Sequence, residues 1–283
     1  MGMLTKQQFD RTRRLALSLA GIELFDRHRE VLVRRSRRHG VVDSAGLEAL
    51  LNGAEAGEPA ATQRLICLLT TKFTGFFRNP RHFDLVAKRA HLVAGQGGRV
   101  RLWSAAAATG EEPYSLAMAL IEAFRRDDPP VEILATDLDT EALAVARRGE
   151  FGELALRRLE PARRARFFST TAIKGRWRVG PAVRGLVELR TLNLVDPVWG
   201  IEGPFDAIFC RNVLMYLQAA HRHAVLERMA LALASDGLLF LDPAEHLGKA
   251  GALFTAQSSG VYSRRHLPSA SARATLPAIV SSQ

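Results

Sequence analysis

Two different periodicities divide this chain along its length. Over residues 5–90 the apolar side chains recur every three or four positions, which is the spacing of amphipathic helices. Turn residues interrupt this pattern, so we expect several short helices, the last of them over 82–93. The glycine-rich stretch 95–98 then predicts a boundary. We therefore expect residues 1–94 to form an all-helical N-terminal domain that includes the linker.

The pattern after residue 98 alternates between short apolar runs and helical spacing. Such alternation predicts mostly parallel strands joined by helices, the doubly wound α/β class of fold. Pro113 begins one of the helical segments, and proline is common at the first position of a helix. The expected strands are 99–105, 131–137, 205–210 and 237–242, and the expected helices are 113–124, 140–148 and 223–233.

One segment departs from this alternation. From about residue 165 to 193 the sequence predicts short antiparallel strands around Gly180-Pro181, a small β excursion from the main sheet. We expect the second domain to span 95–267, with this excursion inside it. Residues 268–283 are rich in serine, alanine and proline and predict a disordered tail.

The turn after the first strand carries the first candidate chemistry. A dinucleotide-binding turn needs several glycines so that the backbone can approach a pyrophosphate. Here Gly110 is followed at once by Glu111 and Glu112, which would repel a pyrophosphate and attract an ammonium or sulfonium group. This pattern disfavours NAD and ATP and favours S-adenosylmethionine (SAM). The alternative is that both glutamates only interact with the positive end of the following helix.

An acid also ends the second expected strand. Asp137 stands where a carboxylate can accept hydrogen bonds from both hydroxyls of a ribose. Asp139, two residues later, is instead expected to cap the next helix. Together with the glutamate turn, Asp137 indicates a nucleoside-containing ligand.

Two asparagines follow later strands and add a possible adenine contact. Asn193-Leu194 and Asn212-Val213 could each combine an amide that binds adenine with an apolar neighbour that holds the ring. A purely turn-forming asparagine is the alternative at either position.

Composition narrows the class of protein. The 283 residues are 47% hydrophobic and 24% charged, which is ordinary for a globular protein. No run approaches the roughly 20 apolar residues that a membrane-spanning helix needs. Two cysteines, Cys67 and Cys210, cannot build a disulfide framework and are expected to be buried thiols in a reducing, cytoplasmic setting.

The net charge of +10 is concentrated near the N-terminus. Arg27, Arg34 and Arg38 would share one face of a helix, opposite an apolar stripe of Phe25 and Leu32. Such a face is either a solvated surface or a landing strip for an acidic protein, an anionic lipid surface or a nucleic acid. A nucleic acid is disfavoured because no aromatic stacking platform accompanies the arginines.

Four stretches taken together are similar to one known family. In motif order, from about residue 15 to 265, the chain resembles the bacterial chemotaxis-receptor glutamate O-methyltransferases, the CheR family. The stretches that carry the resemblance are 69–83, 103–120, 133–151 and 205–217, with the motifs T-x-F-F-R, GEEPYS and FCRNVLxY.

This resemblance implies a Rossmann-like class I methyltransferase domain behind a helical domain, with SAM as methyl donor and no metal. It also implies roles for individual residues. Thr74 and Arg78 match the linker that closes over the donor, and Arg78 is the side chain expected to orient the reacting groups, with Tyr216 as a weaker candidate in the pocket wall. The donor contacts implied are Glu111 at the methionine amino group, Asp137 at the ribose, and Asn193, Leu194, Asn212 and Val213 on the adenine side.

Two positions depart from the family pattern. Lys72 stands two residues before Thr74, where asparagine is usual, and would contact the site only by reaching a carboxylate of donor or acceptor. Pro243-Ala244-Glu245 replaces the family's His-Ser-Glu after the last central strand, which could alter the acceptor geometry.

The implied reaction is methyl transfer from SAM to glutamate side chains of membrane chemoreceptors, whose methylation helices are acidic. A carboxylate acceptor has a pKa near ~4.3 and is already ionised, so neither a general base nor a metal is required.

The arginine face would steer a cytoplasmic monomer to the receptor without nucleic-acid binding or membrane insertion. The β excursion matches a subdomain with which some members grip a receptor tail peptide. The alternatives are methylation of another carboxylate acceptor and a non-catalytic, SAM-binding signalling module.

Overall fold

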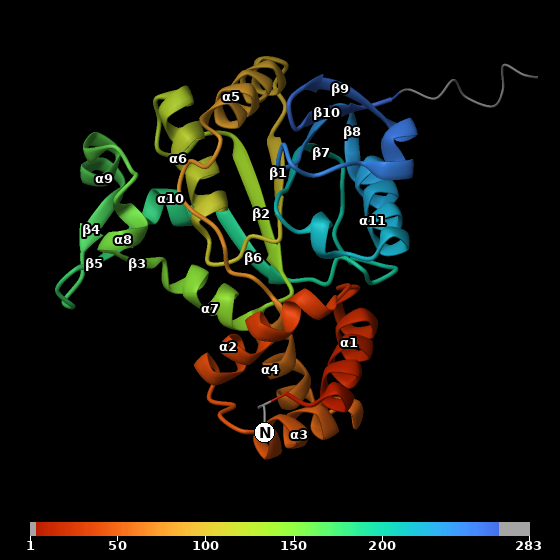
Figure 1. Cartoon of the computed structure of the whole chain (residues 1–283). Coiled ribbons are helices and arrows are strands. Elements are labelled where there is room, and N and C mark those ends of the chain that lie inside the picture. Colours follow the sequence, from red (N-terminus) through yellow and green to blue (C-terminus); the bar gives the residue numbers. More distant parts are fainter. Residues whose placement is uncertain (1–3, 266–283) are drawn as a thin grey trace, which may run out of the picture.

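The computed structural model describes residues 4–265, and the expected tail at 268–283 lies outside them. A helical N-terminal domain lies below the edge of an α/β domain at which the parallel strands end (Figure 1). Leu51, Leu65 and Leu68 form part of its own apolar core. Its elements are α1 (Lys6–Ala20), the 3-10 turn η1 (Asp26–His28), α2 (Arg29–Arg38), α3 (Ser44–Glu55) and α4 (Pro59–Leu69).

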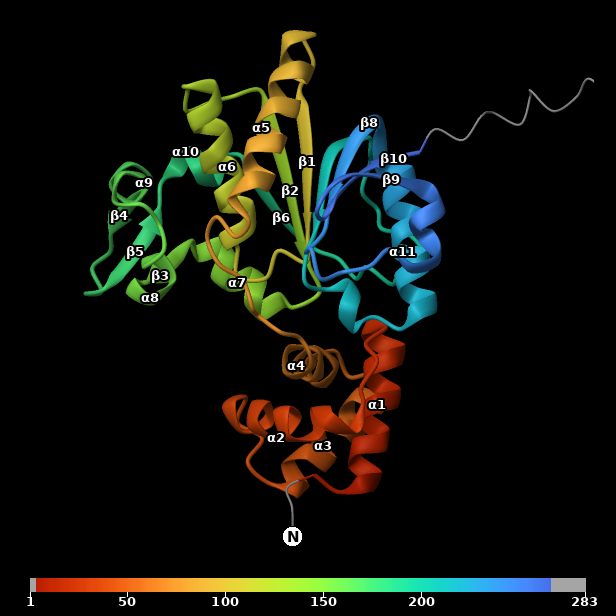
Figure 2. The ribbon, with the colours of Figure 1, turned by 45° about the horizontal axis from the view of Figure 1, so that its top comes forward.

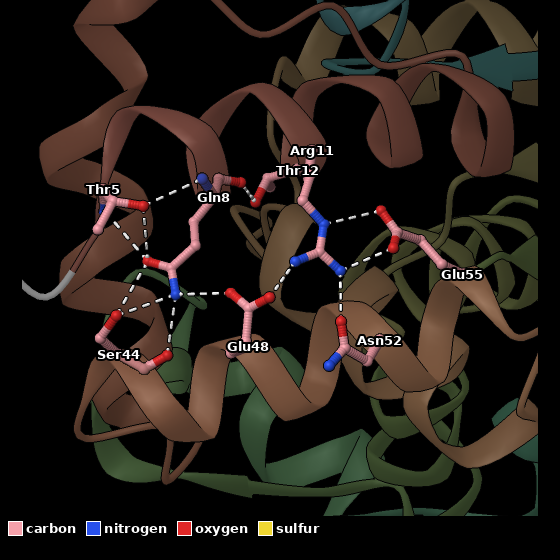
Figure 3. A network of polar contacts seen from close by, with 8 residues as sticks. All are labelled: Thr5, Gln8, Arg11, Thr12, Ser44, Glu48, Asn52 and Glu55. Atoms are coloured by element: carbon pink, nitrogen blue, oxygen red, sulfur yellow. Dashed lines mark hydrogen bonds and ion pairs between the residues drawn. The ribbon is translucent and has the colours of Figure 1, made fainter.

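A polar network joins α1 to α3 along one side of this domain (Figure 3). Gln8 is 4% exposed, and its Nε2 donates to the Ser44 carbonyl at 2.9 Å and to Glu48 at 3.0 Å. One turn later Arg11 donates to both carboxylate oxygens of Glu55, at 2.9 and 2.7 Å. These contacts fix the angle between the two helices.

The main sheet has seven strands in the order β6-β2-β1-β7-β8-β10-β9. The first five in this order run parallel, and β10 pairs antiparallel with both β8 and β9. The doubly wound arrangement expected from the sequence is confirmed. The strands are β1 (Val100–Ala105), β2 (Val131–Asp137), β6 (Val187–Thr191), β7 (Phe205–Cys210), β8 (Leu233–Phe240), β9 (Phe254–Ser258) and β10 (Val261–Arg264).

Helices cover both faces of the sheet (Figure 2). Val100 and Leu102 of β1 pack in one core with α5 and α6, whereas Trp103 and Ala105 face a second core that contains α11. This alternation is the period of two expected of a strand buried on both faces. The helices of this domain are α5 (Pro80–Gly95), α6 (Glu111–Phe124), α7 (Thr140–Arg148), α10 (Pro181–Gly185) and α11 (Ala219–Ala232), with 3-10 turns η2 (Leu214–Tyr216) and η3 (Gly248–Leu253).

The division between the two cores differs from the boundary expected at residue 95. Helix α5 packs against the main sheet through Phe83, Val86 and Ala90, so it belongs to the α/β body. The core of the helical domain ends at Leu69. The glycine-rich stretch 95–98 is therefore only the turn between α5 and β1, and the chain passes between the domains in the linker after α4.

The small sheet also differs from the expected excursion. It has three antiparallel strands in the order β3-β5-β4 and extends over 150–179 rather than 165–193. Residues 187–191 form β6, which pairs parallel with β2 in the main sheet. The elements are β3 (Glu150–Gly152), α8 (Glu153–Leu156), α9 (Pro161–Phe167), β4 (Phe168–Thr170) and β5 (Arg176–Val179).

None of the helices between residues 4 and 265 combines the length and apolar character needed to cross a bilayer.

Candidate active site

A pocket lies between the helical domain and the carboxyl ends of β1, β2 and β7. This is the edge at which doubly wound sheets bind ligands. The loops after these strands contribute its floor, α2 and the end of α1 contribute its opposite wall, and the linker 69–78 crosses one side. The sequence-predicted residues that line it are Thr74, Arg78, Asp137, Asn193, Leu194, Asn212, Val213 and Tyr216.

The turn after β1 adopts left-handed backbone at three positions, Ala106, Ala108 and Gly110. At Gly110 (φ 99°) an added Cβ would lie 2.9 Å from the Cβ of Ala146, so only glycine fits there. Helix α6 consequently starts at Glu111, two residues earlier than its proline suggested. This turn brings the amino end of α6 to the pocket floor.

The two glutamates of the turn face different surroundings. Glu112 lines the pocket, and Glu111 is not among the lining residues. Glu111 is 7% exposed and accepts a hydrogen bond from Thr109 Oγ1 at 2.6 Å. Glu112 accepts from Ser104 Oγ at 2.8 Å at the end of β1. The family resemblance implies Glu111 as the donor contact, whereas Glu112 is the glutamate of this turn that lines the pocket. The donor contact of Glu111 therefore stays a prediction.

Glu112 also contacts a buried cation that the sequence analysis did not single out. Arg211 is 6% exposed, and its Nη1 lies 3.4 Å from Glu112 Oε2. Within residues 4–265 the Nε and Nη1 atoms of Arg211 have no hydrogen-bond partner. Burial raises the pKa of Glu112, and the charge of Arg211 only partly offsets this. Glu112 is thus a buried carboxylate on the pocket floor, and a positively charged ligand group beside it would stabilise its ionised form.

Asp137 lies at the end of β2, as expected. Its Oδ2 accepts from the backbone N–H of Ala108 and its Oδ1 from that of Asp139, both at 2.8 Å. Burial raises the pKa of Asp137 despite these bonds. A carboxylate has further lone pairs, so this fixed side chain can still accept from ligand hydroxyls.

Arg78 reaches the pocket from the linker and is held from two sides. Its Nη2 lies 3.3 Å from Asp242 Oδ2, and its guanidinium carbon lies 5.0 Å from the ring centroid of Phe73. Burial opposes ionisation of Asp242, but hydrogen bonds from Ala244 and Asn212 and the nearby arginines outweigh it and lower the pKa of Asp242. Arg78 is therefore oriented by a carboxylate that remains charged.

Glu245 organises the loop after β7. Its two carboxylate oxygens accept backbone N–H bonds from Asn212 (2.9 Å), Val213 (3.0 Å), Leu214 (2.9 Å) and Asp242 (3.0 Å). Asn212 has a positive φ of 61°, a strained conformation for a residue with a side chain. The glutamate that the chain shares with the family motif therefore holds the pocket-lining loop in place.

Asn193 lines the pocket, but its amide group has protein partners. Nδ2 donates to the Leu19 carbonyl at 2.9 Å and to Asp196 Oδ1 at 3.0 Å. The expected contact between this amide and adenine remains a prediction, whereas a tether to the helical domain is what the structure describes. Its neighbour Leu194 contributes an apolar wall.

Lys72 points away from the pocket toward the amino end of α7. Its Nζ lies 3.3 Å from Asp139 and 3.3 Å from Glu141. Asp139 caps α7 through the N–H of Ala142, as expected, and accepts from Cys67 Sγ at 3.2 Å. The Cys67, Asp139 and Glu141 side chains could hold a metal by spacing alone, but Lys72 places a cation there already.

The arginine face is exposed, but its three arginines do not lie on a single helix as expected. Arg34 and Arg38 lie exposed on α2, whereas Arg27 lies in η1, ahead of that helix. Phe25 is 40% exposed, with the Arg27 guanidinium 4.5 Å from its ring centroid, so the expected stripe of Phe25 and Leu32 is wrong for Phe25. Leu32 is buried in the domain core.

Arg35, between those exposed arginines, faces the pocket instead. It donates to the Leu69 carbonyl at 2.7 Å and to Thr71 Oγ1 at 2.6 Å, and so fixes the linker. Burial lowers the pKa of Arg35. Residues three positions apart lie on the same face of a helix, so the spacing of Arg35 from the apolar Leu32 indicates this inward orientation in the sequence.

Comparisons with known proteins identify the family of this chain. Residues 72–262 match the family model described as CheR methyltransferase, SAM binding domain. The chemotaxis protein methyltransferase 2 of Pseudomonas aeruginosa is 37% identical over 262 residues, which cover 92% of this chain and 93% of that protein. The chemotaxis protein methyltransferase of Escherichia coli strain K12 is 37% identical over 266 residues, covering 92% of this chain and 91% of that protein.

The family match spans the turn after β1, the end of β2 and the loop after β7, which are the three strand ends that form the pocket floor. The resemblance inferred from the sequence motifs, and SAM as the ligand of the α/β domain, are therefore confirmed. This chain belongs to the CheR family of SAM-dependent methyltransferases.

Proposed function

We propose that this protein transfers the methyl group of SAM to glutamate side chains of chemoreceptors, forming glutamate methyl esters and S-adenosylhomocysteine (SAH). The observation that carries the proposal is that one pocket is lined by Glu112 and Asp137 from the strand ends and by Arg78 from the linker. The acids suit a cationic nucleoside donor and the arginine suits an anionic acceptor. The relatives named chemotaxis protein methyltransferases support chemoreceptors as the acceptor class.

The proposed donor site uses the loops that follow β1, β2, β6 and β7. Glu112, rather than Glu111, accepts from the methionine ammonium group, because it is the turn glutamate that lines the pocket. Asp137 accepts from the ribose hydroxyls, and Leu194 and Val213 hold the adenine between them. Asn193 and Asn212 are both proposed to lie on the adenine edge, and each side chain also has a protein partner: Leu19 and Asp196 for Asn193, and Asp242 for Asn212.

Arg78 is proposed to align the reacting groups. Asp242 and the ring of Phe73 restrict its guanidinium, so less conformational freedom is lost when it binds a carboxylate. Thr74 on the same linker and Tyr216 from the loop after β7 form the adjoining wall. Holding the acceptor oxygen in line with the methyl–sulfur bond supplies the entropic part of catalysis.

The proposed step is a single displacement. A carboxylate oxygen of the acceptor forms the bond to the methyl carbon while the methyl–sulfur bond breaks, and its electron pair stays on the sulfur of SAH. The acceptor has an ordinary pKa near ~4.3 and is already ionised, so no proton has to move. Positive sulfonium and negative carboxylate both become neutral, which a pocket of low polarity favours.

Arg27, Arg34 and Arg38 are proposed to dock the acidic helix of the receptor. All three are exposed on the helical domain, which forms one wall of the pocket. Complementary charge raises the rate of encounter more than the final affinity. We propose accordingly that the enzyme acts in the cytoplasm as a monomer on an acidic protein rather than on a nucleic acid.

The positions that depart from the family motifs contact the site only indirectly, through the N–H of Ala244, which donates to Asp242 Oδ1 at 3.1 Å. Neither Lys72 nor Pro243 nor Ala244 is among the residues that line the pocket. Glu245, which holds the pocket loop, is retained. The departures therefore give no support to a non-catalytic donor-binding module.

Incubation with tritium-labelled SAM and receptor-enriched membranes tests the proposal. We expect label on the receptor that alkali releases as methanol, since esters are labile to base. The matched control is Arg78→Ala, which should bind SAH but transfer little label. If the label is stable to alkali, or is found on another acceptor, the receptor glutamate is not the substrate. SAH binding without any methyl transfer would contradict an enzymatic role.

A further inference from the structure

The end of α1 contacts both loops that form the adenine side of the proposed donor site, as the approach of α1 to the α/β domain in Figure 2 suggests. The first contact is to the loop after β6. Asn193 Nδ2 donates to the carbonyl of Leu19, in the last turn of α1, at 2.9 Å. The amide is thus fixed by a residue of the helical domain.

The second contact is to the loop after β7. Gln218 N donates to the Gly21 carbonyl, and Glu23 N donates to the Tyr216 carbonyl, both at 2.9 Å. These two bonds form one antiparallel β-bridge between the domains. Because Tyr216 lines the pocket, the bridge sets the position of the pocket wall.

Gly21 makes this close approach possible. Its φ of 64° ends α1 in a left-handed cap, with the N–H of Ile22 bonded to the Ala16 carbonyl at 3.1 Å. An added Cβ would lie 2.5 Å from Val195 Cγ1 and 3.1 Å from His221 Cγ. A side chain at this position would therefore press on the loop after β6 and on α11, the helix that follows the β7 loop.

We propose that the segment Leu19–Glu23 is a positioning element of the donor site, which clamps the two adenine-side loops from outside the SAM-binding domain. The segment precedes residues 72–262, which match the SAM-binding family model, yet Ile22 and Glu23 line the pocket. The inference rests on the proposed donor site. Its consequence is reciprocal: the clamp strengthens donor binding, and donor binding strengthens the contact between the domains.

Two glycine substitutions in the full-length protein separate this role from backbone strain. Gly57 also has a positive φ, of 74°, but an added Cβ there meets nothing within 4 Å. Gly21→Ala and Gly57→Ala therefore share the strain, and only Gly21→Ala disturbs the clamp. Calorimetry should show SAH affinity reduced about tenfold in Gly21→Ala, as loss of about one hydrogen bond would give, and unchanged in Gly57→Ala.

A compensating substitution provides an independent check. Val195→Ala removes the nearest atom that the new methyl group would meet, while the strain at Gly21 remains. Adding Val195→Ala to Gly21→Ala should restore part of the SAH affinity.

In the wild-type protein, hydrogen exchange at the amides of Glu23 and Gln218 should slow when SAH binds. This measurement does not require the variants to fold.

Three outcomes would overturn the clamp: equal SAH affinity in Gly21→Ala and Gly57→Ala, no recovery in the double variant, or exchange at Glu23 that SAH leaves unchanged. A wild-type protein that fails to bind SAH would instead refute the donor site itself. The two failures are therefore distinguishable from the same titrations.

Discussion

Replacing each turn glutamate separately tests the assignment of the donor's ammonium group. Glu112→Gln keeps the shape of the side chain but removes its charge from the pocket floor. A hydrogen bond to a charged group contributes about 1.5–3 kcal/mol. SAH affinity should therefore fall roughly 10- to 150-fold, since ~1.4 kcal/mol is a factor of ten. Arg211, at 3.4 Å from Glu112, would lose its counter-charge and repel the ammonium group, which favours the upper end.

The matched control is the neighbouring residue. Glu111→Gln changes the adjacent buried acid, whose carboxylate accepts from Thr109 and does not line the pocket, so SAH affinity should stay close to the wild-type value. Calorimetry with methylthioadenosine, which lacks the amino acid, provides a second control. Glu112→Gln should bind it like the wild-type protein. A larger loss in Glu111→Gln, or equal loss of both ligands in Glu112→Gln, would refute the assignment.

The same assignment predicts a pH dependence. Burial raises the pKa of both Glu112 and Asp137 above the usual range of such groups. Donor binding needs the ionised forms, so SAH affinity should fall as the pH drops through the raised pKa values, with a smaller fall in Glu112→Gln. The contribution of these two groups to the stability of the ligand-free protein has the opposite sign: a raised folded-state pKa favours folding at low pH, and this contribution is lost as pH rises. An SAH affinity that does not fall with pH, or that falls equally in the wild-type protein and Glu112→Gln, would contradict this account.

Three further predictions concern other parts of the site. Arg78→Ala should lower kcat for methyl transfer far more than SAH affinity; equal losses would make Arg78 an ordinary donor ligand. The double variant Arg34→Glu/Arg38→Glu should raise KM for receptor at low salt and approach wild type at high salt, because exposed charges act over about 8–10 Å at physiological ionic strength; an unchanged KM in the folded variant at low salt would leave the face as a solvated surface. Lys72→Met should reduce thermal stability, because its ion pairs with the α7 carboxylates are partly buried, without weakening SAH binding; a large loss of affinity would return Lys72 to the donor site.

The elements predicted best are those whose signal is local. Strands 131–137 and 205–210 and helix 140–148 occur with the expected bounds. Each is an apolar run or an amphipathic segment with its own boundary residues, such as the cap Asp139. Strand ends in a parallel sheet also meet at one edge, so Asp137 and Asn212 could be placed together from the sequence.

The features that were missed depend on distant parts of the chain. The partner of Asn193 is a carbonyl of α1, 174 positions earlier, and no local pattern reports it. The inward orientation of Glu112 depends on the phase of α6, which the backbone of Ala106, Ala108 and Gly110 sets. The sequence alone does not place α5 with the α/β domain, because an amphipathic helix shows only that one of its faces is covered and not which core covers it.

Peptide mass spectrometry of a chemoreceptor after reaction with the enzyme and SAM tests the central claim most directly. We predict a mass increase of one methylene group on glutamate side chains of an acidic receptor helix, dependent on Arg78 and reversed by alkali. A receptor left unmodified by an enzyme that binds SAM, or one methylated on a nitrogen-containing side chain, would contradict the account.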